Sequence, residues 1–524
     1  MLTARGRGGQ SSLVPFALHP VLAAAYPVVF LFAQNVADQV TLGPLWLPLA
    51  GAVVGGAAAL VAGRLVTGDW LRGALLATLA IALFFSFGHV WNLVGDALVV
   101  RRWLIAAYAI VGLLGFLLIW RGGGWVPAMS RFLLAALAIG LVLNAWTIAS
   151  FTLRDTTAQA VAVEAPIDVS VGDPGRPDIY FIVMDRYAGQ PTLREQYGYD
   201  NAPFLDALRD RGFAVAEDAW ANYLKTALSL ASTLSMDLLD GEAMSARAEE
   251  GREIVEAYDI LQSALPVPIT LQSLGYEWVH IGSYWEPTGT NAHADRVIGS
   301  SRGDQFTSAL LQTTALSLLS PPSEPGERTT AVWGTSKEFT IRQFGHLADT
   351  ASMAGPTFVF THFLVPHPPY NFDIDGSTPT EEERAARTEE EEYVRQLTWT
   401  NERLIETIDA LLDVPEAEQP VIVLAADEGP FPEGTDTARF DWLEATPEQL
   451  QRKYAILNTI RMPGIDPTTV GFHDRSTPVN TFRYVMNAYF DADLPLLPDA
   501  TFLSPDYARM YDFVEVTRGE ERAP

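Results

Sequence analysis

The chain of 524 residues contains no cysteine. This absence excludes disulfide bonds, thiolate metal ligands and cysteine nucleophiles. It does not assign a compartment, because an oxidising environment permits disulfides without requiring them. Lysine is also scarce: Lys225, Lys337 and Lys453 stand against 32 arginines. A nucleophile or metal ligand in this chain must therefore come from other side chains.

The net charge changes sign between the start of the chain and the rest. Residues 1–154 hold nine arginines and three aspartates, a net charge of +6, whereas the remainder holds 26 basic and 60 acidic residues, a net charge of −34. A domain this acidic repels nucleic acid, so we expect no nucleic-acid partner. Its acidity fits a soluble, extracytoplasmic or moderately halophilic setting.

Apolar residues gather in the same first third. Five apolar stretches are long enough to cross a bilayer, which takes about 20 residues; they lie near 14–34, 43–63, 72–94, 102–120 and 131–151. With a cytoplasmic N-terminus, six of the nine arginines fall on the cytoplasmic side. We predict a five-helix transmembrane domain over 1–154 in the cell (inner) membrane, with the rest of the chain outside the cytoplasm. Four spans and a buried fifth helix are the alternative.

A linker rich in proline and glycine, 155–178, precedes a second pattern. Short apolar runs alternate there with amphipathic stretches, which indicates an extracytoplasmic α/β domain over 179–524 with a mostly parallel central sheet. The predicted strands are 179–184, 212–215, 276–281, 357–364, 421–425 and 456–461. The predicted helices lie near 201–211, 250–274, 337–353, 390–412 and 477–489. The acidic run 381–392 is predicted to be a solvated loop and helix start.

Polar residues stand where these predicted strands end. Asp185 follows the first strand, and Asp427 and Glu428 follow the strand 421–425. Because ligands bind at the carboxyl ends of parallel strands, we expect these carboxylates to converge. Carboxylates with the hydroxyl of Thr226, which begins a predicted helix, would bind a hard divalent cation and activate that hydroxyl. The alternative is ordinary capping, since both residue types cap strands and helices.

At these residues the chain resembles the sulfatase and alkaline phosphatase superfamily. In particular it is similar to the membrane-anchored branch of lipoteichoic acid synthases and lipid A phosphoethanolamine transferases, which join five spans to an extracytoplasmic catalytic domain. The segment 226–230 is similar to the nucleophile segment of the phosphoethanolamine transferases, whose threonine forms a covalent intermediate. The resemblance implies an alkaline-phosphatase-like fold, a Thr226 nucleophile, and a metal held by Asp185, Thr226, Asp427 and Glu428.

The chain departs from that pattern at one ligand. The family commonly carries Asp-His-Gly where this chain has Asp427, Glu428 and Gly429. An all-oxygen ligand set favours Mn²⁺, Mg²⁺ or Ca²⁺ over Zn²⁺. The same departure keeps open a second hypothesis, a non-catalytic binding or sensing domain with a degenerate metal site.

The resemblance also implies substrate contacts. His367, in the segment Pro-His-Pro-Pro-Tyr, resembles the substrate-facing histidine of the family, and Lys225 would help to stabilise developing charge. His280 and Trp285, with Arg296 beyond them, are similar in position to a head-group pocket of the lipoteichoic acid synthases.

True sulfatases need a formylglycine, made in a Cys/Ser-x-Pro-x-Arg segment. This chain has no cysteine, and its Ser-x-Pro segments lack the arginine. The leading hypothesis is therefore metal-dependent phosphoryl-type transfer or phosphodiester hydrolysis on a lipid- or glycan-linked substrate in the cell envelope. Sulfuric ester hydrolysis stays as an alternative. The sequence leaves the substrate, the acceptor and the oligomeric state open.

Overall fold

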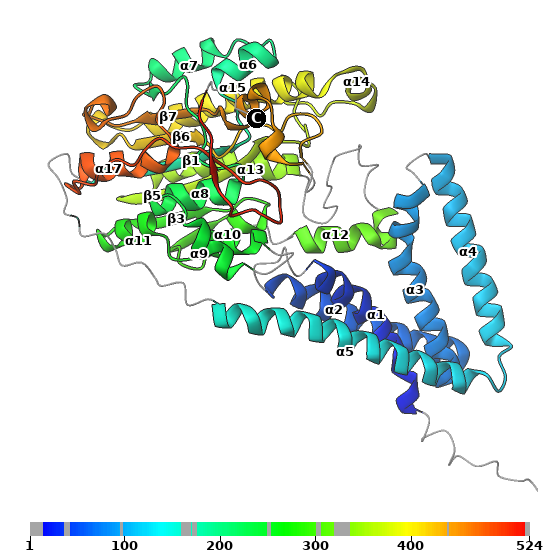
Figure 1. Cartoon of the computed structure of the whole chain (residues 1–524). Helices are drawn as coiled ribbons and strands as arrows, with labels where there is room; N and C mark the ends of the chain where they lie inside the picture. Colours follow the sequence, from blue (N-terminus) through cyan, green and yellow to red (C-terminus); the bar gives the residue numbers. More distant parts are fainter. Residues whose placement is uncertain are drawn as a thin grey trace, which may run out of the picture. The chain divides into compact units, whose positions relative to one another are not determined.

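The computed structural model describes residues 14–35, 42–94, 98–158, 169, 176–248, 253–299, 305–318, 336–436 and 440–518. The chain forms two compact units, one helical and one α/β (Figure 1). The helical unit comprises residues 1–159 with short segments from the range 303–333, and the α/β unit comprises the rest. Most of the predicted linker 155–178 lies outside the described residues.

Five helices follow one another in the helical unit. They are α1 (His19–Gln34), α2 (Gly43–Thr67), α3 (Trp70–Val94), α4 (Leu98–Trp120) and α5 (Val126–Ala158), preceded by a short 3-10 turn, η1 (Val14–Ala17). Within the described residues, four stretches are long and apolar enough to cross a membrane: Gly43–Thr67, Trp70–Trp91, Arg102–Trp120 and Val126–Ser150. The prediction of a multi-helix membrane domain holds for these four. The expected first span is a helix of 16 residues, shorter than the others.

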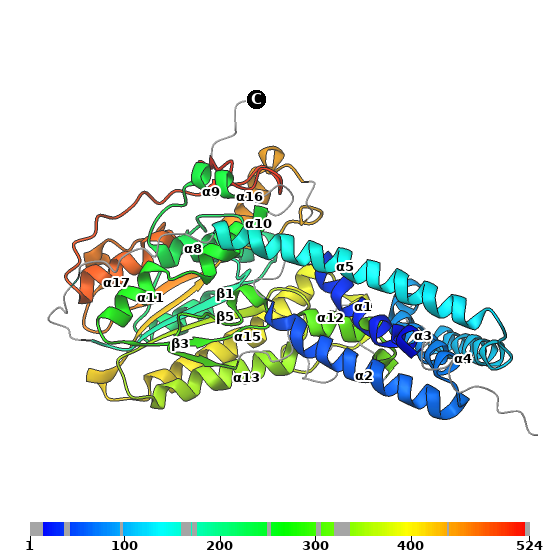
Figure 2. The same cartoon turned by 90° about the horizontal axis from the view of Figure 1, so that it is seen from below.

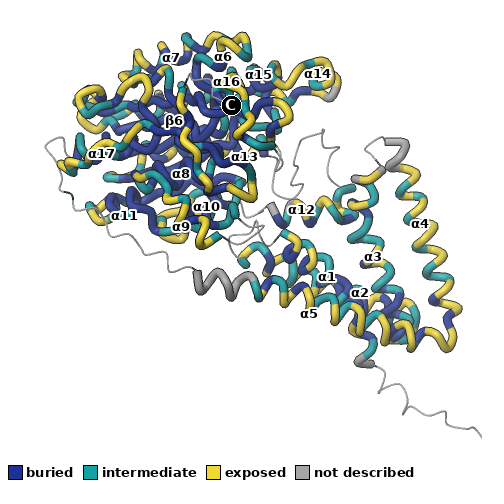
Figure 3. The backbone as a smooth tube through the Cα atoms, in the orientation of Figure 1, coloured by how far each residue is buried: buried dark blue, intermediate teal, exposed yellow. Residues whose placement is uncertain are grey.

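The surface of the helical unit is apolar. Large hydrophobic side chains are exposed on α2, α4 and α5, among them Leu65, Trp103 and Trp146. Much of α4 and α5 is coloured as exposed in Figure 3. Inside the unit, small residues let helices approach closely: a Cβ on Gly63 of α2 would lie 2.2 Å from the carbonyl oxygen of Gly73 in α3. Exposed apolar faces together with small residues between helices are typical of proteins that lipid surrounds.

One helix of this unit comes from far along the chain. The helix α12 (Gln305–Thr313) packs Phe306 edge-on against Phe32 of α1, with ring centroids 5.2 Å apart. Phe306 and Leu310 share a buried cluster with residues of α1, α2 and α5. The contacts fall near the end of α1, the start of α2 and the later part of α5, which alternating helices bring to the same end of the unit. The sequence analysis did not anticipate this insertion.

Because the protein lacks cysteine, this packing can be tested by a single introduced pair. We expect Phe32→Cys with Phe306→Cys, in the full chain in membranes, to form an intramolecular disulfide under mild oxidation, read by peptide mass spectrometry. Ala309→Cys replaces Phe306→Cys as the matched control, since Ala309 is exposed on the same helix. Equal cross-linking of both pairs would contradict the packing of α12 against α1.

The α/β unit is built on a seven-stranded sheet of order β2-β7-β6-β1-β5-β3-β4. Its strands are β1 (Ile179–Asp185), β2 (Ala214–Val215), β3 (Glu277–Ile281), β4 (Arg296–Ile298), β5 (Thr357–Pro366), β6 (Val421–Ala426) and β7 (Asn458–Arg461). Five neighbouring strands, β6, β1, β5, β3 and β4, pair in parallel, and at one side β7 pairs antiparallel with both β6 and β2. The mostly parallel sheet is therefore confirmed. A separate two-stranded ladder joins β8 (Phe502–Leu503) and β9 (Val514–Glu515).

Helices cover both faces of the large sheet. On one face lie α8 (Thr226–Ser235), α11 (Pro266–Ser273) and α17 (Thr481–Tyr489), and on the other α13 (Ser336–Asp349) and α15 (Glu389–Leu412) (Figure 2). Every residue of β1, β5 and β6 is buried, which explains why these strands are nearly continuous apolar runs. The other helices are α6 (Gln190–Gln196), α7 (Ala202–Arg209), α9 (Gly241–Arg247), α10 (Glu253–Gln262), α14 (Glu381–Ala386) and α16 (Pro447–Tyr454).

The helix predicted near 250–274 is two helices in its described part, α10 and α11. Pro266 begins α11, and a proline disfavours helical geometry in the residue before it, so the chain turns there. The acidic run 381–392 begins two helices, α14 and α15. Each starts with a capping box, Thr380 with Glu383 and Thr388 with Glu391.

Candidate metal and nucleophile site

Three buried side chains converge at the carboxyl edge of the central strands. Met184 of β1 lies opposite Ala426 of β6, so Asp185 and Asp427 leave neighbouring strands at the same level. His362 lies within β5, on the other side of β1. Asp185, His362 and Asp427 each direct one ligand atom to within 4.8 Å of the others. The sequence analysis predicted the two carboxylates and missed the histidine.

Neighbouring hydroxyls fix which nitrogen of His362 carries the proton. The Ser283 hydroxyl donates to the carbonyl oxygen of Trp285 at 3.0 Å, so Thr288 must donate to Ser283 across their 2.7 Å contact. Thr288 then has only a lone pair for His362 Nδ1, 3.0 Å away, and Nδ1 must donate. Burial lowers the pKa of His362 to about 3, so the ring is neutral. His362 therefore presents a bare Nε2 lone pair.

That lone pair faces a second acceptor. His362 Nε2 lies 3.8 Å from Asp427 Oδ2, and neither atom has a hydrogen-bond partner among the described residues. The other oxygen of Asp427 accepts the backbone amides of Arg186 (3.1 Å) and Glu428 (2.7 Å), which turns Oδ2 toward the histidine. Asp185 Oδ1 is likewise buried and unpartnered within the described chain. Acceptors that face one another in a buried space fit a shared cation.

The electrostatics of the two carboxylates agree with this arrangement. Burial, reinforced by Asp427, raises the pKa of Asp185 well above its ordinary value. Burial, reinforced by Glu428, raises the pKa of Asp427 to about 7. A divalent cation between these groups would favour their ionised forms. The buried Asp/His/Asp cluster is thus suited to bind a metal ion.

His362 changes the reasoning about the metal. The expected all-oxygen ligand set ranked Zn²⁺ behind Mn²⁺, Mg²⁺ and Ca²⁺, but the observed set contains an imidazole nitrogen. Imidazole with carboxylates suits Zn²⁺ and Mn²⁺ as well. The geometry therefore supports a divalent cation and removes the reason to rank Zn²⁺ last.

Thr226 lies beside this cluster as the first residue of α8, and it is only half buried. Its hydroxyl is close enough to Asp427 to favour the ionised carboxylate, which opposes the larger effect of burial on the pKa of Asp427. The backbone amides of the first helical turn point toward the same place, where they favour negative charge. The structure thus brings together Asp185, Thr226 and Asp427 of the predicted metal set.

Glu428, the fourth predicted ligand, is engaged in an ion pair. Its Oε1 lies 2.8 Å from Lys453 Nζ and 3.3 Å from Arg186 Nε, while Oε2 is buried without a partner in the described chain. Lys453 is fully buried at the end of α16. Burial lowers the pKa of Lys453 to about 7, although Glu428 favours its charged form.

Three cationic groups surround one aromatic ring at this site. The ring centroid of Phe431 lies 4.5 Å from the Arg186 guanidinium carbon, 4.7 Å from Lys225 Nζ and 3.4 Å from Lys453 Nζ. Arg186 follows an irregularity at the end of β1 and has a left-handed backbone with φ of 60°, which is uncommon for a residue other than glycine. The unusual turn directs its guanidinium toward Glu428 and away from the strand.

The predicted substrate-binding residues divide into two groups. Lys225 immediately precedes Thr226, and its Nζ donates to the hydroxyl of Tyr507 at 2.9 Å. His367 follows β5 and is half buried; desolvation, with Arg186 nearby, holds its pKa well below the ordinary value. Trp285 packs edge-on against His362, with ring centroids 5.8 Å apart.

The other two do not belong to the Asp/His/Asp cluster. His280 is buried in β3, where its Nε2 donates to the carbonyl oxygen of Thr288 at 2.9 Å, so it supports the Thr288 loop. Arg296 is on the edge strand β4, two strands beyond β5, and pairs with Glu277 at 2.8 Å. The structure does not bring Arg296 to the Asp/His/Asp cluster.

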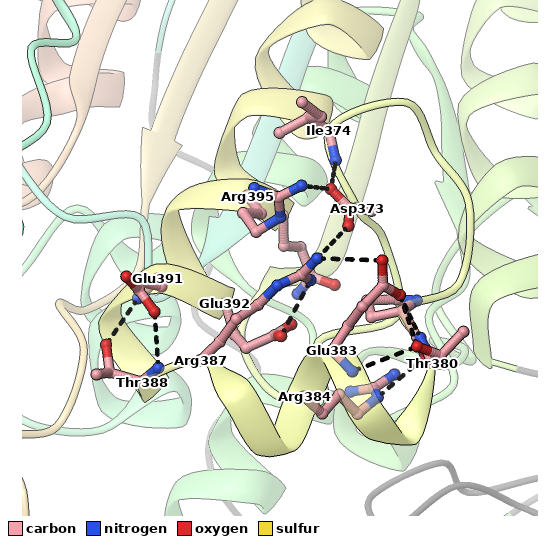
Figure 4. Close-up of polar contacts among 12 residues, drawn as sticks. Asp373, Ile374, Thr380, Glu383, Arg384, Arg387, Thr388, Glu391, Glu392 and Arg395 are labelled. Carbon is pink, nitrogen blue, oxygen red and sulfur yellow. Dashed lines mark hydrogen bonds and ion pairs between the residues drawn. The ribbon is translucent and has the colours of Figure 1, made fainter.

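Ion pairs hold the segment that carries His367. Asp373 accepts from Arg387 at 3.0 Å and from Arg395 at 2.5 Å, and Arg387 also contacts Glu392 at 3.2 Å (Figure 4). The side-chain nitrogen of Gln396 donates to the carbonyl oxygen of His367 at 3.1 Å. The loop after β5 is therefore fastened to α15, which fixes the place of His367.

Comparisons with known proteins gave structural matches only: no family model and no curated protein sequence matches this chain. The integral membrane lipooligosaccharide phosphoethanolamine transferase A from Neisseria meningitidis matches at 13% identity over 91% of this chain and 95% of its own, with a TM-score of 0.39. The C-terminal periplasmic domain of EptC from Escherichia coli matches at 13% identity over 65% of this chain and 93% of its own, with a TM-score of 0.40.

An alkaline phosphatase superfamily protein from Vibrio parahaemolyticus matches at 12% identity over 67% of this chain and 80% of its own, with a TM-score of 0.40.

The raised pKa values predict how metal binding depends on pH. A cation displaces protons from Asp185 and Asp427, so binding releases protons and tightens as pH rises. With a pKa of about 7, Asp427 alone gives about a tenfold gain in Mn²⁺ affinity between pH 6 and pH 8. Titration calorimetry of the full chain in detergent, in two buffers of different protonation enthalpy, measures both effects. An affinity that does not change with pH would contradict ionisation of these groups on binding.

Proposed function

We propose that this protein is a membrane-anchored, metal-dependent enzyme that transfers or hydrolyses phosphoric esters through a Thr226 nucleophile. The observation that carries the proposal is the place of Thr226. A half-exposed hydroxyl begins a helix beside Asp427, whose free oxygen faces His362. Nucleophile, cation ligands and helix N-terminus together fit attack on an anionic ester.

The chain's own residues supply most of the chemistry. Thr226 Oγ1 forms a bond to phosphorus while the bond to the leaving ester oxygen breaks, and the hydroxyl proton passes through solvent to that oxygen, which departs as an alcohol. Water or an acceptor hydroxyl then attacks the phosphorylated threonine and restores the free hydroxyl. A bound divalent cation would act as a Lewis acid on the phosphoryl oxygens. His367 is neutral because its pKa is low, so it would contribute a hydrogen bond and not a charge.

The anchor suggests the kind of substrate. Four membrane-length helices precede the α/β unit in the chain, and a bilayer is their expected environment. An enzyme fixed to a membrane works on molecules that are held there. We therefore propose a lipid- or glycan-linked substrate of the cell envelope, with the α/β unit on the extracytoplasmic side of the cell membrane.

A non-catalytic binding or sensing role is the second candidate. It is favoured by Glu428, which replaces a histidine of the family pattern and forms an ion pair with Lys453. Loss of one expected ligand would weaken a metal site. No observation favours sulfuric ester hydrolysis over phosphoric ester chemistry.

Substitution of the nucleophile tests the enzymatic proposal. With Mn²⁺ and bis(4-nitrophenyl) phosphate as the probe, Thr226→Ala in the full chain should lower turnover by about 10³-fold or more, because no covalent intermediate can form. Thr226→Ser keeps a hydroxyl and should retain part of the activity.

Ser235→Ala, at the other end of α8, is the matched control and should leave turnover unchanged. Turnover of Thr226→Ala within a few-fold of the parent protein would exclude a threonine nucleophile. Absence of any turnover with several generic phosphodiesters, in a protein that binds Mn²⁺, would favour the binding or sensing role.

A further inference from the structure

Glu428 and Lys453 form a buried ion pair beside the metal cluster that the family pattern does not contain. Lys453 has all its donors in use: Nζ bonds Glu428 Oε1 at 2.8 Å and the carbonyl oxygen of Gly429 at 3.1 Å, and lies 3.4 Å from the centroid of Phe431. Its side chain is 0% exposed. A cation this enclosed is a fixed part of the site.

We propose that the site is built for a single divalent cation, held by Asp185, His362 and Asp427, and that Glu428 is not a ligand but the anchor of Lys453, a built-in positive charge. The proposal rests on the metal-dependent function proposed above and names which of its residues touch the cation. It makes Glu428 and Lys453 positioning residues.

The carboxylate of Glu428 is directed to cationic side chains and not to the metal cluster. One oxygen of Glu428 is shared by Lys453 and Arg186 at 2.8 and 3.3 Å. Glu428 also lies outside the group of ligand atoms that approach within 4.8 Å of one another. In Asp427, in contrast, one oxygen accepts hydrogen bonds from two backbone amides, and the other belongs to that group. Adjacent acids in the sequence thus have different tasks.

The loop after β6, which carries Glu428, is held rigidly against the end of α16. The amide of Gly429 donates to the carbonyl oxygen of Lys453 at 2.8 Å, and Lys453 Nζ returns a bond to the Gly429 carbonyl. A Cβ on Gly429 would lie 2.3 Å from the carbonyl oxygen of Arg452, so the loop after β6 touches the backbone of α16. This double contact holds the ammonium in place, so Glu428 cannot turn to a metal without leaving Lys453 buried and unpaired.

The charges of the site's own residues also favour a single divalent cation. Once a bound cation has displaced their protons, the carboxylates Asp185, Asp427 and Glu428 carry three negative charges, and Arg186 and Lys453, paired with Glu428, carry two positive charges. One divalent cation turns the remaining single negative charge into a single positive charge, which suits an anionic substrate group. A second divalent cation would leave three uncompensated positive charges in a buried space, which is costly. The positive charge of Lys453 thus replaces the charge that a second metal ion would supply.

Metal stoichiometry tests the proposal without reference to turnover. Titration calorimetry and elemental analysis of the full chain with Mn²⁺ should give one equivalent. Asp185→Asn and His362→Ala should lower Mn²⁺ affinity by about 30-fold or more, since each removes a ligand. Glu428→Gln should keep one equivalent with an affinity within about threefold of the parent.

The double variant Glu428→Gln with Lys453→Met removes the pair together and avoids an unpaired buried charge. It should also bind one equivalent of Mn²⁺ at near-parental affinity, while its affinity for inorganic phosphate in the presence of Mn²⁺ should fall about tenfold. That loss is the result which a merely structural pair would not produce. Two equivalents in the parent protein, Mn²⁺ loss in Glu428→Gln equal to that of Asp185→Asn, or unchanged phosphate affinity in the double variant would each overturn the proposal.

These outcomes separate the inference from the function on which it rests. If Asp185→Asn and His362→Ala bind Mn²⁺ as the parent does, the metal site itself is wrong. If those variants lose Mn²⁺ and Glu428→Gln loses it too, the metal site stands and only the role given to Glu428 fails.

Discussion

His362 Nε2 and Asp427 Oδ2 face each other across 3.8 Å, and the buried Oδ1 of Asp185 belongs to the same cluster; none of the three atoms has a hydrogen-bond partner among the described residues. A buried polar atom without a partner costs about 1–3 kcal/mol, and more when it is charged. The three acceptors on Asp185, His362 and Asp427 would take up much of a typical folding stability of about 5–15 kcal/mol. A cation that satisfies several of them at once explains why the fold tolerates this arrangement.

Neighbouring elements of the α/β unit hold these side chains in position. Parallel pairing of β1 with β5 and β6 brings the three side chains to one edge of the sheet. The hydroxyls of Ser283 and Thr288 set the tautomer of His362 from a loop after β3. The helix α8 places Thr226 beside the cluster, and the loop after β6 is tied to α16 through Gly429. Each of these elements thus holds one group of the site in place.

Much of this could be predicted from the sequence where the signal is local. Apolar runs gave the parallel strands, and the acids directly after them gave Asp185 and Asp427. His362 was missed because it lies inside β5 and not at its end, and because the residue that orients it, Thr288, is 74 positions away. The apolar run of β5 is interrupted at Thr361 and His362, and that break was the one available signal.

Other parts depend on contacts that no local pattern contains. The pairing of Glu428 with Lys453 requires the approach of α16 to the loop after β6. The sequence therefore could not show that Glu428, at the position of the family's histidine, forms an ion pair. Arg296 was placed near a head-group pocket by resemblance of position alone, but in the structure it lies on the short strand β4 and pairs with Glu277 at the sheet edge. The insertion of α12 into the helical unit brings together Phe32 and Phe306, 274 positions apart, which only the folded chain shows.

The central claim is that one divalent cation lies among Asp185, His362 and Asp427. Anomalous diffraction at the absorption edge of the bound metal, from crystals of the full chain grown with Mn²⁺ near neutral pH, tests it most directly. The account predicts a single anomalous peak within coordination distance of His362 Nε2 and of an oxygen from each aspartate. A peak bound by Glu428 in place of His362, or no peak at these residues, would contradict it.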